Sequence, residues 1–219
     1  MINLNQFIGS FNLIIFDLDG TLIDSHNQIE SAMNEARIEL GYGKSPSGQI
    51  FQKLGQPVND LFFDLKLSPA SQEHLVFTFR SYLNEKIEQN NPCFPGVIDL
   101  IRLFRSNEIK IAIATSKQTL MAKSVVSNSL LSGKIDYVQG TDGFPPKPSP
   151  EVIEFCLNSF PGSQAIMIGD RTEDMFAAKN AGIPSIGIAQ SAHSASELER
   201  AGACFTFQKI VDFYQWAKD

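Results

Sequence analysis

The chain of 219 residues carries 24 acidic and 18 basic side chains, which give it a net charge of −6, and 43% of its residues are hydrophobic. This length and apolar content suffice for one substantial core and a small inserted domain. The negative balance excludes a general electrostatic attraction to nucleic acid or to anionic membranes, so an anionic ligand would need a local group of cations.

The sequence also shows no segment that we expect to enter a membrane. Its first basic residue is Arg37, so the N-terminus lacks the charged region of a signal peptide. The apolar run at residues 13–16 is far shorter than the roughly 20 residues that cross a bilayer. We therefore expect a cytoplasmic protein whose partners include neither a membrane nor nucleic acid.

Apolar runs that end in a turn and lead into a helical pattern recur along the chain. They predict strands at residues 11–16, 109–114, 165–168 and 183–188, with weaker strand patterns at 135–139 and 203–205. The intervening helical patterns lie at residues 97–104, 120–131, 150–157 and 173–181. This alternation predicts an α/β fold with a doubly wound parallel sheet.

Residues 25–92 interrupt that alternation. They show helical periodicity without a convincing strand, and glycines and prolines divide them into short stretches. We predict that they form an α-helical cap domain inserted after the first strand. Residues 1–24 and 93–219 would then form a Rossmann-like core.

The hexapeptide DLDGTL, residues 17–22, directly follows the first expected strand. Open α/β sheets bind ligands at the carboxyl ends of their strands. On an extended chain Asp17 and Asp19 share one face while Leu18 points the other way. Two carboxylates there are costly unless a hard cation such as Mg²⁺ compensates them, and the alternative is a helix cap or an Asx turn.

Three further segments carry polar groups that suit a phosphate or a metal ion. Thr115 and Ser116 follow the strand at 109–114, where a hydroxyl and backbone amides suit a phosphate, although a helix N-cap is the alternative. Lys147 lies in the segment PPKPSP, whose prolines could fix its ammonium against phosphate oxygens; the alternative is a solvated lysine.

Asp170 and Asp174 follow the strand at 165–168, where they could complete a cation site or serve as first-turn helix acids.

The order and spacing of these motifs resemble those of the haloacid dehalogenase superfamily across essentially the whole chain. The resemblance is to the phosphoglycolate phosphatase-like branch with a small helical cap, through DLDGTLIDS (17–25), FPGV (94–97), KPSP (147–150) and AGIP (181–184). The cap shares a looser pattern, LGQP (54–57). The resemblance implies a magnesium-dependent phosphatase, monomeric or homodimeric, that hydrolyses a small phosphorylated metabolite such as a phosphoglycolate-like compound or a sugar phosphate.

The resemblance also implies the roles of the acidic residues. Asp17 matches the nucleophile, and its carboxylate is already ionised at neutral pH. Asp19 matches the general acid and base that protonates the leaving alcohol and then activates water. Asp17, the main-chain carbonyl of Asp19 and Asp170 would bind Mg²⁺, and Asp174 would orient these ligands.

The remaining roles concern the bound phosphate and the leaving group. Thr115, Ser116 and Lys147 would hold the oxygens of the transferred phosphate. Because these groups contact what all substrates share, discrimination must come from the cap, where Lys53 is the preferred candidate for binding a second substrate anion. His26, at the junction of core and cap, is expected at a solvated helix start.

Two other functions are considered. A β-phosphoglucomutase-like phosphoryl transferase retains all four motifs and would return the phosphoryl group to a sugar. A non-catalytic binding module with the same fold should have lost the nucleophile or the metal ligands, whereas Asp17, Asp19, Lys147 and Asp170 are all present. A dehalogenase is disfavoured, because a halide leaving group needs no acid at position 19.

Overall fold

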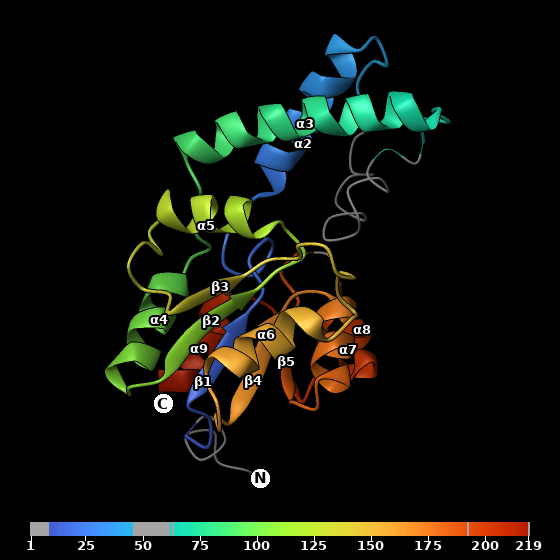
Figure 1. The fold of residues 1–219 in the computed structure, drawn as a ribbon. Coiled ribbons are helices and arrows are strands. Elements are labelled where there is room, and N and C mark those ends of the chain that lie inside the picture. The colour runs from blue at the N-terminus through green and yellow to red at the C-terminus, as the bar shows by residue number, and fades with distance from the viewer. Residues whose placement is uncertain (1–8, 46–61, 63, 192, 219) are drawn as a thin grey trace.

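The computed structural model describes residues 9–45, 62, 64–191 and 193–218. One parallel sheet dominates the fold, with its strands in the order β3-β2-β1-β4-β5-β6 and helices on both faces (Figure 1). The strands are β1 (Leu13–Phe16), β2 (Lys110–Ala114), β3 (Tyr137–Gln139), β4 (Ala165–Gly169), β5 (Ser185–Ile188) and β6 (Phe205–Phe207). The predicted doubly wound α/β fold is confirmed.

Helices cover both faces of the sheet, because both faces of its central strands are apolar. Ile14 and Phe16 face the layer that contains α4 (Val97–Ser106) and α9 (Ile210–Lys218). Leu13 and Ile15 face the opposite layer, formed by α6 (Glu151–Ser159) and α7 (Thr172–Asn180). Successive side chains of a strand alternate between the faces, so a continuous apolar run serves both layers.

Several elements differ from the sequence-based expectation. The helix expected at 120–131 is α5 (Thr119–Ser127). It ends there because the Ser129 hydroxyl donates to Val126 O and accepts the Leu131 N–H. These two hydrogen bonds compete with those that would continue the helix. The last strand lies at Phe205–Phe207, two residues later than expected. The helices α8 (Ala195–Ala201) and α9 were not predicted.

The segment predicted as a cap contributes α2 (His26–Glu39) and α3 (Pro69–Gln89), which pack against each other. The two helices lie away from the sheet, beyond α5 (Figure 1). The incoming and outgoing chain segments run antiparallel and are paired by two backbone hydrogen bonds. The Asp24 N–H donates to Pro92 O at 2.9 Å, and the Phe94 N–H donates to Leu22 O at 3.1 Å. The domain boundaries at 24/25 and 92/93 remain a prediction.

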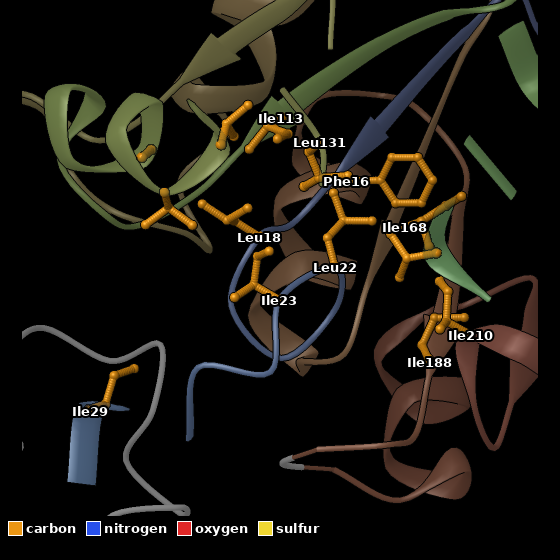
Figure 2. Packing of buried hydrophobic residues seen from close by; sticks show 14 of the residues in the cluster. Phe16, Leu18, Leu22, Ile23, Ile29, Ile113, Leu131, Ile168, Ile188 and Ile210 are labelled. Carbon is orange, nitrogen blue, oxygen red and sulfur yellow. The ribbon is translucent and has the colours of Figure 1, made fainter. Parts of the chain in front are cut away.

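The loop that follows β1 is anchored in the apolar core. Leu18, Leu22 and Ile23 are fully buried, and Figure 2 shows them beside Phe16 and Ile168. The burial of Leu18 agrees with its expected orientation away from Asp17 and Asp19. None of the helices in the described ranges is long and apolar enough to span a membrane.

Candidate functional site

The carboxyl ends of three neighbouring strands bring the expected site residues together. Phe16 at the end of β1 lies opposite Ile113 of β2 and Ile168 of β4. The residues that follow are therefore adjacent at one edge of the sheet, and they include Asp17, Thr115 and Asp170. Because β2 and β4 lie on opposite sides of β1, this edge is a topological switch point, where α/β sheets bind ligands.

Three buried carboxylates cluster at this edge. Oxygens of Asp17, Asp170 and Asp174 lie within 4.8 Å of one another. Asp174 comes from the first turn of α7, where its Oδ2 accepts the Arg171 N–H at 3.0 Å. Gly169 has no room for a side chain, because a Cβ there would overlap the Asp174 carboxylate. The helix-cap role and the place in the acidic cluster thus both hold for Asp174.

Lys147 reaches this cluster from a distant part of the sequence. Its buried Nζ donates to Asp17 Oδ1 at 2.6 Å, to Asp174 Oδ1 at 2.5 Å and to Ala114 O at 2.9 Å. The alternative of a solvated lysine in a stiff loop is therefore wrong. The ammonium lies directly beside the carboxylate expected to act as the nucleophile.

Burial and mutual repulsion set the ionisation of these acids. Burial raises the pKa of Asp17 to about 8; Lys147 acts in the opposite direction, and Asp174 and Asp170 add to the increase. Burial and Asp174 raise the pKa of Asp170 to about 6. Burial lowers the pKa of Lys147, but Asp17 and Asp174 together bring it above its ordinary value. Lys147 alone therefore does not keep Asp17 ionised at neutral pH, which corrects the sequence-based expectation for this carboxylate.

The chemistry of this donor set fits a hard divalent cation. Carboxylate oxygens are the ligands that Mg²⁺ prefers, and a cation among them would favour their ionised forms. Asp170 Oδ1 already accepts a hydrogen bond of 2.8 Å from the Thr21 hydroxyl, which fixes its orientation. Asp174 has both oxygens engaged, by Lys147 and by the Arg171 N–H, which suits an orienting role.

Asp19 has a partner that the sequence did not reveal. Its Oδ2 lies 3.0 Å from Nζ of Lys117, and the Lys117 side chain is only 8% exposed. Within the described part of the chain, Asp19 Oδ1 is buried without a hydrogen-bond partner. Lys117 stands two residues after Thr115, and that spacing could have indicated that it returns to the same edge.

Thr115 and Ser116 lie on the loop between β2 and α5. Thr115 is buried and its hydroxyl accepts the Lys117 N–H at 3.3 Å, while Ser116 is half-buried. The N-cap of α5 is Gln118, so the alternative of Thr115 or Ser116 as the cap of that helix is wrong. Their position beside β1 leaves the phosphate-binding interpretation as the prediction for both.

Two further expectations concern residues outside the central cluster. His26 begins α2 as expected, but its side chain is only 13% exposed and contacts Ser191 and Asp24, so the solvated assignment is wrong. Lys53 lies outside the described residues.

A small pocket beside the cluster is lined by Asp19, Gly20, Ser25, His26, Asp170, Arg171 and Ser191.

Comparisons with known proteins show which family the chain resembles. The family described as haloacid dehalogenase-like hydrolase matches residues 14–188. A probable phosphatase IndB from Dickeya dadantii is 32% identical over 92% of this chain and 90% of the relative. A phosphoglycolate phosphatase from Vibrio cholerae is 30% identical over 82% of this chain and 84% of the relative. A haloacid dehalogenase-like hydrolase from Streptococcus pneumoniae superposes with a TM-score of 0.84 at 29% identity, over 95% of this chain and 99% of its own.

Proposed function

The chain belongs to the haloacid dehalogenase-like hydrolase family and is a phosphatase, and we propose that its activity depends on magnesium. Its substrate is a small phosphomonoester, which it hydrolyses through an aspartyl-phosphate on Asp17. The observation that carries the proposal is the buried cluster of Asp17, Asp170, Asp174 and Lys147 at the switch point of the sheet. The experiment that tests it is phosphate release from a panel of phosphorylated metabolites with and without Mg²⁺.

In the first step a carboxylate oxygen of Asp17 forms a bond to phosphorus and the bond from phosphorus to the ester oxygen breaks. Asp19 gives its proton to that leaving oxygen. The Lys147 ammonium donates a hydrogen bond to Asp17, so it lies where the phosphoryl group would bind. There it would neutralise negative charge on the phosphoryl oxygens during the attack. Thr115 and Ser116 would hold the remaining phosphate oxygens from the neighbouring loop.

In the second step Asp19, now a carboxylate, takes a proton from water while the water oxygen attacks phosphorus. The bond between Asp17 and phosphorus breaks and inorganic phosphate leaves. The ion pair of 3.0 Å between Asp19 and Lys117 supports this assignment, because it holds the carboxylate next to the proposed phosphate-binding loop. Lys117 is therefore a residue that we add to the proposed site.

Asp17, Asp170 and the main-chain carbonyl of Asp19 would hold Mg²⁺, with Asp174 orienting the ligands. A bound Mg²⁺ supplies positive charge that offsets the repulsion between an anionic nucleophile and an anionic phosphate. Thr21 and Lys147 support this arrangement, since each fixes one of the carboxylates through a short hydrogen bond. The raised pKa values of Asp17 and Asp170 give the cation a further role, because it would favour their ionised forms.

The leaving group would be selected by the cap, residues 25–92, which we propose closes over the site and excludes water. Lys53 remains our proposal for a contact with a second anion. Relatives named phosphoglycolate phosphatase support a small anionic leaving group. Phosphoryl transfer to a sugar is the second candidate, and it predicts conversion of a sugar phosphate without release of phosphate.

Replacement of Asp19 should separate the general acid from the nucleophile. Asp19→Ala keeps Asp17 and the backbone carbonyl, so we expect kcat to fall by on the order of 10²- to 10⁴-fold for alkyl phosphates and by less for nitrophenyl phosphate, whose leaving group needs no proton. Steady-state kinetics on both substrates measures the difference. Equal losses on the two substrates would contradict the role of Asp19 as the acid.

Removal of the metal should abolish turnover. Chelation is expected to stop phosphate release and added Mg²⁺ to restore it, because without a cation the raised pKa of Asp17 keeps the nucleophile largely protonated at neutral pH. Ca²⁺ should inhibit, since its larger radius and more variable coordination would misplace Asp17. Phosphate release is measured at a series of metal concentrations, and full activity in chelator would refute the metal site.

A further inference from the structure

We infer that His26 and Ser191 form a bridge that positions Asp170 and ties it to the first turn of α2. The inference rests on the proposed function, because it takes Asp170 to be a ligand of the metal ion. It adds two residues to which the sequence motifs assign no role, and it connects the metal site to the segment that we propose as the cap.

The bridge joins three segments that are distant in the sequence. His26 is the first residue of α2, Ser191 follows β5, and Asp170 follows β4. His26 Nε2 lies 2.9 Å from Ser191 Oγ, and its Nδ1 lies 3.2 Å from Asp24 Oδ1. The Ser191 hydroxyl and the Asp170 carboxylate are neighbours, because both lie against the same side of Gly20 and line the same small pocket. The inferred bridge has this hydroxyl donate to the carboxylate, which agrees with the lowering effect of Ser191 on the Asp170 pKa.

Counting hydrogens gives the bridge a direction. A serine hydroxyl has one hydrogen, and an ionised carboxylate can only accept. In the inferred bridge Ser191 donates its one hydrogen to Asp170, so its oxygen must accept from His26 Nε2. The Asp24 carboxylate on the other side of the ring can also only accept, so the bridge requires His26 to carry a hydrogen on both Nδ1 and Nε2. Partners of this kind fix the orientation of a metal-ligating carboxylate.

Gly20 makes room for this contact. Its φ of +86° favours glycine, and a Cβ at this position would lie 2.5 Å from Asp170 Oδ2 and 2.8 Å from Ser191 Oγ. The loop that carries Asp17 and Asp19 therefore passes directly against the two partners. Gln190 reinforces the same approach, because its amide donates to the carbonyl oxygens of Gly20 and Thr21 at 3.1 and 3.0 Å.

The order Asp24, His26, Ser191 also matches the arrangement of a hydrolytic triad, which would need the hydrogen bond between His26 and Ser191 to run the other way. A general-base histidine must accept the serine proton. In the inferred bridge that proton is donated to Asp170 and Nε2 donates to the serine oxygen. The bridge therefore makes Ser191 a positioning residue rather than a nucleophile.

The bridge couples the metal site to α2 in both directions. If contact with α2 improves Mg²⁺ binding, thermodynamic linkage requires that Mg²⁺ stabilises the contact by the same factor. Mg²⁺ should consequently slow hydrogen exchange of the amides in the first turn of α2. The same addition should not slow exchange when Ser191 is replaced by alanine.

The test measures Mg²⁺ binding by titration calorimetry without substrate. Ser191→Ala and His26→Ala should each weaken Mg²⁺ binding about tenfold, as loss of partners of metal ligands does. The double variant should be no weaker than Ser191→Ala, because both substitutions break one chain. His26→Gln can place a donor near Nε2 and should restore binding, whereas His26→Asn mimics Nδ1 and should not. His74→Ala, at an exposed position of α3, is the matched control and should bind as the wild type does.

The outcomes separate this inference from the proposed function. If the wild-type protein binds no Mg²⁺, the proposed metal site fails. If the wild type binds Mg²⁺ and Ser191→Ala and His26→Ala bind it equally well, the bridge has no positioning role and only this inference fails. Equal restoration by His26→Asn and His26→Gln would also overturn it. Thermal unfolding of each variant identifies loss of fold, and the comparison of Gln with Asn remains decisive if the alanine variant at position 26 unfolds.

Discussion

Asp17→Asn is expected to lower kcat by at least about 10⁴-fold, because it removes the ionised oxygen that attacks phosphorus. The substitution keeps the shape of the side chain. Lys147 retains Asp174 and Ala114 O as acceptors, so its ammonium stays paired in the variant. We therefore expect a folded protein that binds substrate but does not turn it over.

Release of inorganic phosphate by the purified variant measures this loss, and thermal unfolding checks the fold. Mass spectrometry after rapid acid quenching should detect an added phosphoryl group on the peptide that contains Asp17 in the wild type only. Asp99→Asn is the matched control, because this aspartate is exposed on α4. Substantial turnover by Asp17→Asn would refute a covalent mechanism at this residue.

Lys147→Met is expected to reduce both activity and stability. It keeps much of the length of the side chain but leaves Asp17 and Asp174 buried without their shared cation. Breaking a buried ion pair in this way costs about 3 to 5 kcal/mol of folding free energy. Loss of a charge beside the transferred phosphoryl group should lower kcat/KM by on the order of 10²- to 10³-fold for every substrate.

The pH profile gives an independent readout of the same substitution. Lys147 lowers the pKa of Asp17, so its removal should raise that pKa and move the acid limb of the activity profile to higher pH. Lys53→Ala is the contrast, since it should change the ranking of natural substrates and leave a small aryl phosphate nearly unaffected. Equal kcat/KM values for Lys147→Met and the wild type would refute the role of Lys147.

The central strands and the residues that follow them could be predicted from the sequence, because both signals are local. A continuous apolar run predicts a buried strand, and Asp17, Thr115 and Asp170 come immediately after such runs. Parallel strands with short connections then bring these residues to one edge. Lys147 could be predicted only through its motif, because nothing local indicates that it reaches Asp17.

The contacts that sequence reasoning missed depend on pairs that are far apart in the chain. His26 and Ser191 are separated by 165 positions, and neither lies in a pattern that distinguishes a buried polar residue from a solvated one. Lys117 directly follows the predicted phosphate-binding residues Thr115 and Ser116, but its partner Asp19 belongs to another strand end. The short helix α8, in contrast, does have a local signal, a capping box in which Ser194 and Glu197 hydrogen-bond each other.

The burial of Leu18, Leu22 and Ile23 beneath the loop after β1 has a consequence for local unfolding. Most loops open at little free-energy cost, because few apolar contacts are lost. This loop cannot open without withdrawing three apolar side chains from the core that also contains Phe16 and Ile168. Hydrogen exchange of its backbone amides should therefore require an opening free energy about as large as that of the amides in the central strands. The carboxylates of Asp17 and Asp19 are thus held by the most stable part of the molecule, so motions that admit substrate or release product must occur in other segments.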